Sequence, residues 1–132
     1  MIGKVHHFGF LVKNIRKSVE TFQIFGYEFD KEITFDDIRK AEICFLKKNG
    51  ERIELVAPHP ESDLFPLLKK YNNTIYHICY ETDDLDTAIQ CLKGKGFLLF
   101  KEKQAAPAIS VTAEVAFLMH INLGIVELIQ KG

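Results

Sequence analysis

The sequence repeats itself at a distance of 70 residues, and this internal repeat restricts the folds that the chain can adopt. Residues 5–30 align with residues 75–100 without a gap, and His7 falls on His77. Both aligned segments open with an apolar, strand-forming stretch that carries the histidine at its third position, "VHHFGFLV" and "IYHICYET". The chain is therefore expected to contain one structural unit twice.

Two shorter matches extend the repeat to the end of each half. The segment "AEICFL" (41–46) matches "AEVAFL" (113–118), and "IEL" (53–55) matches "VEL" (126–128). Their offsets are slightly larger than 70, which indicates short loop insertions in the second half. A half of this size buries too little surface to fold alone, so we expect the two halves to pack together.

Each half shows the same order of patterns: an apolar strand, a helix and three further strands. Each expected helix starts after an Asn or Asp residue and ends at a glycine, Gly26 in the first half and Gly96 in the second. The apolar residues that share one helix face are Ile15, Val19 and Phe22 in the first half and Leu85, Ile89 and Leu92 in the second. Asn49 and Gly50 predict a tight hairpin between two of the strands.

The repeat also predicts the organisation of the domain. We expect a single domain in which module one covers about residues 1–58, a linker covers 59–73 and module two covers 74–132. The segment "KEKQAAPAIS" (101–110) is expected to be a flexible loop between strands.

The composition argues against several classes of function. The 132 residues are 47% hydrophobic and 27% charged, and the formal net charge is −1. No basic stripe with interleaved aromatic residues indicates nucleic-acid binding, and no apolar run is long enough to span a membrane. The chain starts without the pattern of a signal peptide, and its three cysteines, Cys44, Cys79 and Cys91, fit reduced thiols. These features predict a cytoplasmic protein that binds neither nucleic acid nor membranes.

Two histidines and two glutamates occupy equivalent, unusual positions in the two halves. Glu54 and Glu127 interrupt strands of Ile, Leu and Val, where an ionised carboxylate costs several kcal/mol unless it is paired or binds a cation. A lone strand histidine is more often a core residue, and a lone strand glutamate more often faces solvent. The duplication favours a shared role: if the halves are related by a two-fold axis, His7, Glu54, His77 and Glu127 can converge on one divalent metal ion.

The motifs that carry these residues resemble the vicinal oxygen chelate superfamily, which includes glyoxalase I, methylmalonyl-CoA epimerase, extradiol dioxygenases and bleomycin-resistance proteins. The resemblance rests on "VHHFGFLVKNIRKSVETF", "RIELVAP", "YHICYETDDLDTAIQCLKGKG" and "AFLMHINLGIVELIQ". It implies an α+β fold of two tandem βαβββ modules, which form a curved, cup-like mixed sheet with helices on the outside. It also implies one divalent ion (Co, Ni, Mn, Zn or Mg) on His7, Glu54, His77 and Glu127, and a homodimer.

Within this superfamily the sequence is most similar to methylmalonyl-CoA epimerase. The likeness implies a metal-dependent isomerase that enolises a carbonyl or thioester substrate, with Glu127, and then Glu54, as the proton-transferring carboxylates. The chain lacks the Glu-Gln-Gly segment of the epimerase before the third strand and the His-Pro-Lys run before the last strand. A lyase like glyoxalase I (lactoylglutathione lyase) and a non-catalytic small-molecule-binding protein therefore remain as alternatives.

Four further residues are candidates for binding the substrate. They are Asp37, Arg39, Glu81 and His120. For Arg39 the alternative is an exposed salt bridge, and for the other three it is a solvated loop or strand end.

Overall fold

The computed structural model describes residues 1–132, which divide into two compact units. The first unit is His7–Tyr76, and the second unit combines Met1–His6 with His77–Gly132. The boundary between the units falls inside the opening strand of each sequence repeat.

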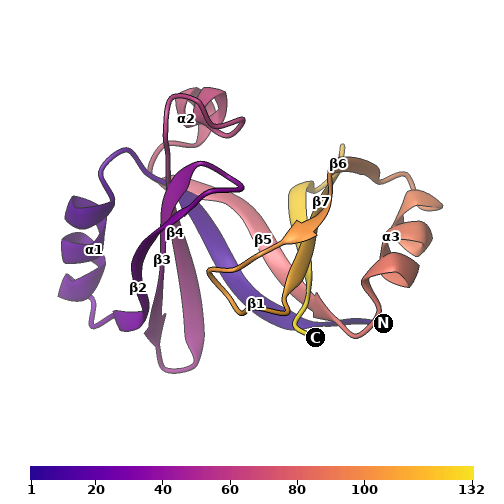
Figure 1. Ribbon diagram of the computed structural model, residues 1–132, viewed down its shortest axis with the longest axis horizontal. Coiled ribbons are helices and arrows are strands. Elements are labelled where there is room, and N and C mark those ends of the chain that lie inside the picture. Colours follow the sequence, from indigo (N-terminus) through magenta and orange to yellow (C-terminus); the bar gives the residue numbers. More distant parts are fainter. The chain divides into compact units, whose positions relative to one another are not determined.

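The first unit contains one helix and one sheet, followed by two short helices. Its elements are β1 (Ile2–Leu11, which belongs to this unit from His7 on), α1 (Ile15–Ile24), β2 (Glu28–Asp36), β3 (Ala41–Lys48), β4 (Glu51–Pro58), the 3-10 helix η1 (Phe65–Leu67) and α2 (Leu68–Tyr71). The strands lie in the order β2-β3-β4-β1, and β1 runs parallel to β4 while the other pairs are antiparallel. Figure 1 shows α1 beside this sheet.

The second unit repeats the same plan. Its elements are β5 (Thr74–Thr82, from His77 on), α3 (Leu85–Lys93), β6 (Leu98–Ala105), β7 (Glu114–His120) and β8 (Gly124–Gln130). The strands lie in the order β5-β8-β7-β6, with β5 parallel to β8. The predicted order of one strand, one helix and three strands is thus confirmed in both halves (Figure 1).

The two long helices begin and end in equivalent ways. The side chains of Asn14 and Asp84 each accept a hydrogen bond from the backbone N–H three residues on, at 3.1 Å in both helices, which caps an N-terminus that otherwise lacks partners. Gly26 and Gly96 follow the helices with φ of 92°, a conformation that glycine adopts without steric cost. The predicted helix limits therefore arise from local chemistry that the sequence carries.

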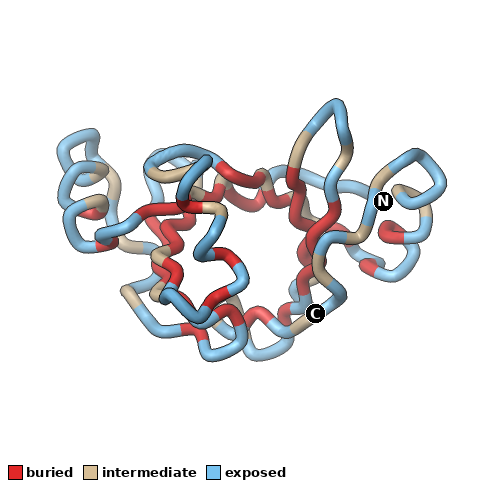
Figure 2. The backbone as a smooth tube through the Cα atoms, turned by 90° about the horizontal axis from the view of Figure 1, so that it is seen from above, coloured by how far each residue is buried: buried red, intermediate tan, exposed pale blue.

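The core lies between each helix and its sheet. In the first unit Ile15 and Val19 of α1 pack with Leu46 and Leu55, and in the second unit α3 packs with a matching set from β7 and β8. Figure 2 shows the buried stretches, in red, running mainly along the strands, while much of each helix is exposed. Of the apolar helix faces predicted from the sequence, Ile15, Val19, Leu85 and Ile89 are buried, while Phe22 and Leu92 are half-buried against the same clusters.

Two loop predictions have different outcomes. Asn49 and Gly50 both have positive φ, 50° and 83°, and form the predicted tight turn between β3 and β4. The prediction of a loop over 101–110 is wrong for its first half, because β6 continues to Ala105 and pairs with β7.

Two further features concern the cysteines and the helices. No disulfide joins the three cysteines, of which Cys44 and Cys79 are buried and Cys91 is half-buried. None of the helices has the length and apolar character needed to cross a membrane.

Candidate functional site

In the first unit, two neighbouring parallel strands bring a histidine and a glutamate together. Gly9 of β1 lies opposite Glu54 of β4, and His7 precedes Gly9 by two residues, so His7 and Gly9 share a strand face. The His7 Nε2 atom lies 3.1 Å from Glu54 Oε1. Both residues are 1% exposed, so the pair is removed from solvent.

The second unit builds the same pair with the same register. Cys79 of β5 lies opposite Glu127 of β8, and His77 precedes Cys79 by two residues. The His77 Nε2 atom lies 2.9 Å from Glu127 Oε1, and both side chains are fully buried. The sequence repeat therefore corresponds to a repeat of side-chain geometry.

A phenylalanine completes each pair. Phe45 of β3 lies opposite Glu54, and its ring meets the His7 ring edge to face at 5.3 Å between centroids. Phe117 of β7 lies opposite Glu127 and meets His77 in the same way at 5.2 Å. These rings restrict the orientation of the imidazoles. The sequence reasoning did not select them, although the "AEICFL" and "AEVAFL" match contains both.

The donor atoms of each pair suit a divalent metal ion. Each histidine offers a ring nitrogen and each glutamate a carboxylate oxygen. Two ligand atoms bound about 2.1 Å from one ion and at right angles to each other lie about 3.0 Å apart. The separations of 3.1 Å and 2.9 Å are compatible with this value. They also fit a direct hydrogen bond between the imidazole and the carboxylate.

The first unit adds a buried arginine that contacts its glutamate. Arg39, in the turn between β2 and β3, donates from Nη1 to Glu54 Oε2 at 3.2 Å. Its Nε lies 3.9 Å from Asp36 Oδ2, and Arg39 is 7% exposed. The expected alternative of an exposed salt bridge is wrong for Arg39. Asp36, the neighbour of Asp37, is also buried.

The other predicted substrate-binding residues lie in ordinary surroundings. Asp37 is exposed in the turn after β2, and Glu81 on β5 is half-buried, 3.5 Å from the Lys131 ammonium. His120 ends β7, and its Nδ1 accepts a hydrogen bond from the backbone N–H of Asn122 at 3.0 Å. The substrate-binding roles assigned to these residues remain predictions.

The pKa of the Cys44 thiol is affected by burial and by the nearby charge of Glu54. Cys44 lies on β3 beside Leu55 and is 1% exposed. Burial, followed by the negative charge of Glu54, raises the pKa of the Cys44 thiol to about 12. This thiol is therefore neutral at physiological pH and is not a nucleophile.

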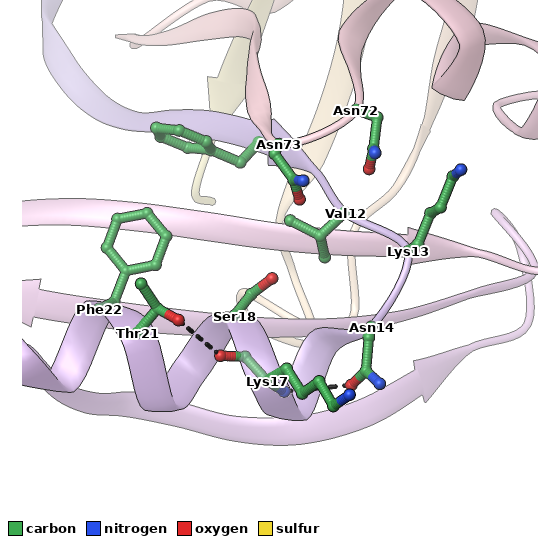
Figure 3. Close-up of a pocket in the computed structure, with 10 residues that line it drawn as sticks. Val12, Lys13, Asn14, Lys17, Ser18, Thr21, Phe22, Asn72 and Asn73 are labelled. Atoms are coloured by element: carbon green, nitrogen blue, oxygen red, sulfur yellow. Dashed lines mark hydrogen bonds between the residues drawn. The ribbon is translucent and has the colours of Figure 1, made fainter.

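A separate cavity of about 570 Å³ lies in the first unit, between α1, the end of β1 and the two asparagines that precede β5. Figure 3 shows Lys17 and Ser18 of α1 on one side of it and Asn72 and Asn73 on the other. Neither His7 nor Glu54 lines this cavity. It is therefore distinct from the buried pairs described above.

Sequence comparison connects the chain to a family and to one enzyme. The Glyoxalase/Bleomycin resistance protein/Dioxygenase superfamily matches residues 6–130. The mitochondrial methylmalonyl-CoA epimerase of Dictyostelium discoideum is 28% identical over 96 residues, which are 69% of this chain and 56% of that protein. The chain thus spans just over half the length of this curated relative.

Structure comparison extends the likeness to the whole fold. A variant of Streptomyces coelicolor methylmalonyl-CoA epimerase, in complex with 2-nitronate-propionyl-CoA, matches with a TM-score of 0.84 and 19% identity, covering 100% of this chain and 99% of that chain. The epimerase of Mycobacterium tuberculosis matches with a TM-score of 0.81 and 20% identity, over 97% and 87% of the two chains. A hypothetical protein from Bacillus halodurans C-125 matches with a TM-score of 0.81 and 24% identity, over 98% and 94%.

These matches establish the fold, and they confirm the predicted α+β class with its two βαβββ modules. The family match, in turn, includes both histidines, both glutamates and nearly all of the elements that carry them. The chain belongs to the glyoxalase/bleomycin resistance protein/dioxygenase superfamily.

Proposed function

We propose that this protein is a divalent-metal-dependent isomerase that enolises an acyl-CoA thioester, in the manner of a methylmalonyl-CoA epimerase. The observation that carries the proposal is the buried His–Glu pair that each unit builds with the same strand register. Buried carboxylates of this kind cost folding energy unless a cation or a hydrogen-bond network compensates them. A duplicated cost at equivalent positions favours a functional reason for both.

The proposed metal centre uses all four residues for one ion. His7 and Glu54 supply two ligands from the first unit, and His77 and Glu127 supply two from the second. Imidazole and carboxylate ligands with open positions suit Co, Ni, Mn, Zn or Mg more than a closed structural site. When bound, the ion would act as a Lewis acid that stabilises the negative charge of an enolate.

Glu127 is the proposed proton-transferring carboxylate. In the proposed reaction Glu127 accepts the proton from the carbon next to the thioester carbonyl, and the C–H electron pair moves into the enolate. A proton from solvent water then reaches the opposite face of the enolate, which inverts the carbon, and Glu127 releases its own proton to solvent. Glu54, whose Oε2 accepts from Arg39, serves as a ligand in this scheme. General acid–base catalysis of this kind contributes about 10²–10⁴-fold to the rate. No redox partner or leaving group is required.

The relatives support the substrate class. The curated relative carries the name methylmalonyl-CoA epimerase, and epimerase structures of the same fold bind methylmalonyl-CoA or 2-nitronate-propionyl-CoA. We extend this substrate class to the present chain, and hydrogen exchange in methylmalonyl-CoA tests it.

The test is hydrogen exchange at the substrate in deuterated water. The protein, loaded in turn with Co, Ni, Mn and Zn, is incubated with methylmalonyl-CoA, and deuterium at the α-carbon is followed by mass spectrometry. Metal-free protein is the control for spontaneous exchange. We expect metal-dependent exchange that proceeds faster than in this control.

A parallel sample contains the adduct of methylglyoxal and glutathione. Conversion of this adduct, with no exchange in methylmalonyl-CoA, would identify a lyase of the glyoxalase I type instead. Absence of metal binding in the wild-type protein would contradict the proposed centre altogether.

A further inference from the structure

Arg39 holds one oxygen of a proposed metal ligand. Its Nη1 donates to Glu54 Oε2 at 3.2 Å, while the other carboxylate oxygen, Oε1, lies 3.1 Å from His7 Nε2. The two oxygens of Glu54 therefore have different neighbours. One is committed to the guanidinium, and the other lies at the position from which it could share a cation with His7.

The backbone of Arg39 is fixed on both sides. Asp36 Oδ1 accepts hydrogen bonds from the backbone N–H groups of Ile38 and Arg39, at 2.8 and 3.1 Å. The Ser62 hydroxyl donates to the carbonyl oxygen of Arg39 at 2.6 Å. Asp36, Arg39 and Ser62 are all buried, so this support is not exposed to competing water.

The second module has no arginine at the matching place. With the offset of the "AEICFL" and "AEVAFL" match, Arg39 corresponds to Val111 and Asp36 corresponds to Ala108. Val111 is 97% exposed, in the segment between β6 and β7. The arginine is thus present in only one of the two modules. Because the second module adopts the same fold without it, the fold alone does not require an arginine at this position.

We propose that Arg39 is a positioning residue that restricts Glu54 to a single oxygen, Oε1, for metal binding. The proposal rests on the metal centre of the proposed function and replaces the substrate-binding role predicted for Arg39. An arginine suits this task because its planar fork fixes direction as well as charge. Without it, Glu54 is free to rotate or to bind through both oxygens.

The test measures metal binding without substrate. Co²⁺ affinity is determined by calorimetric titration for the wild type, for Arg39→Lys and for Arg39→Met, and the visible absorption spectrum of each Co²⁺ form is recorded. Residues that orient metal ligands typically change affinity by about 10–100-fold when replaced. We expect Arg39→Lys to lose about tenfold in affinity and to show an altered spectrum, because an ammonium keeps the charge but not the fork.

Two comparisons separate positioning from general damage to the fold. Arg16→Met removes an exposed arginine that also contacts a glutamate, Glu42, at 3.4 Å, and should leave affinity and spectrum unchanged. In a Glu54→Gln background, Arg39→Lys should change affinity by less than about twofold, since residues that act through one another are not additive. Ser62→Ala keeps every charge, and we expect it to reproduce part of the loss and the same direction of spectral change.

The outcomes separate the positioning role of Arg39 from the metal centre itself. If the wild type binds Co²⁺ while Arg39→Lys and Ser62→Ala keep its affinity and spectrum, the positioning role is overturned and the metal centre stands. An equal loss for Arg39→Lys in the wild-type and Glu54→Gln backgrounds also overturns it. A wild type that binds no metal overturns both proposals.

Discussion

Glu54 and Glu127 are single charged residues within the otherwise apolar core strands of this protein. Both lie within strands of Ile, Leu and Val, and neither is more than 1% exposed. A buried ion pair is often no more stable than the apolar residues that could replace it. Stability alone therefore does not account for these residues, whereas a ligand or proton-transfer role does.

The first prediction concerns the role of Glu127. Glu127→Gln keeps the shape and one oxygen donor but removes the basic carboxylate, so metal affinity should fall only modestly. Exchange of the substrate α-proton should fall by about 10²–10⁴-fold, the loss typical of a general base. Both are measured on the same Co²⁺-loaded sample. Glu61→Gln, at an exposed glutamate, is the matched control. Full exchange by metal-saturated Glu127→Gln would leave Glu127 as a ligand only.

The second prediction concerns Cys44 and high pH. Because folding raises the thiol pKa from 9.0 to about 12, the folded state holds this proton more tightly than the unfolded state. The contribution is complete below pH 9.0 and is lost as pH rises toward 12, at about 1.4 kcal/mol per pH unit. Urea denaturation of wild type and Cys44→Ala between pH 8 and 11 measures it. We expect their stability difference to shrink above pH 9, and a constant difference would contradict this account.

The candidate site was only partly predictable from the sequence. The two histidines and two glutamates could be selected because the repeat aligned them, and the structure pairs them within each unit. Arg39 could not be recognised as buried, because it lies in the polar run "FDDIRK", which is typical of an exposed turn. Its burial depends on Glu54, a residue of a different strand, and no local pattern contains that information.

Among the secondary-structure elements, the start of each long helix is determined by a local hydrogen bond. Asn14 caps α1 through the backbone N–H of Lys17. Replacing an N-cap asparagine by alanine typically costs about 1 kcal/mol. We therefore expect Asn14→Ala to lower the free energy of unfolding by about this amount in urea denaturation. Asn14→Asp retains an acceptor and should stay within a few tenths of a kcal/mol of the wild type. Equal denaturation midpoints for Asn14→Ala and wild type would argue against the cap.

The equivalent cap on α3 is charged, so it should respond to acid. The pKa of Asp84 lies below 3.8 because its carboxylate accepts hydrogen bonds from the Thr87 N–H and hydroxyl. This stabilisation is present above pH 3.8 and is lost as pH falls through the lower folded pKa. We expect Asp84→Asn to show a smaller decline in stability than the wild type below pH 4, measured by thermal unfolding. Parallel acid profiles would contradict the prediction, and Asn14→Ala should show no such change in profile.

The segment 101–110 shows where local patterns mislead. Its first half is polar and was expected to be a loop, yet Gln104 and Ala105 pair with Val115 and Glu114 of β7. Strand pairing supplies backbone partners regardless of side-chain polarity, and β6 lies at the edge of its sheet, where charged side chains are common. The order of elements was predictable because the repeat and the caps are local, whereas the length of β6 depends on its partner.

In the whole molecule, the two compact units do not coincide with the two sequence repeats. Residues 1–6 open the first sequence repeat, but they belong with the second unit. A side chain at Gly3 would approach the Glu81 carbonyl oxygen within 3.2 Å, which shows how closely this opening segment follows β5. A fragment that ends at residue 73 would separate these neighbours. Neither module is therefore expected to fold when expressed alone.

Exposed apolar side chains at one end of the second unit predict self-association. Leu98 and Met119 are neighbours across β6 and β7, and Ile121 and Leu123 follow in the turn before β8. Their exposed fractions are 69%, 37%, 96% and 56%. Exposed apolar residues that gather in one region are often covered in the working form of a protein. We call these four residues the β7–β8 patch and expect a second copy of the chain to cover it.

The last prediction is that the protein is a homodimer. A chain of 15.1 kDa should sediment at micromolar concentration as a species of about 30 kDa, since two-fold dimers are the commonest oligomers. A lysine at position 121, within the β7–β8 patch, would place a charge in the interface on both subunits, so Ile121→Lys should shift the population to monomer. Val111→Lys changes an equally exposed apolar residue outside the patch and should remain dimeric. A monomeric wild type would refute the dimer, and a dimeric Ile121→Lys would move the interface to another surface.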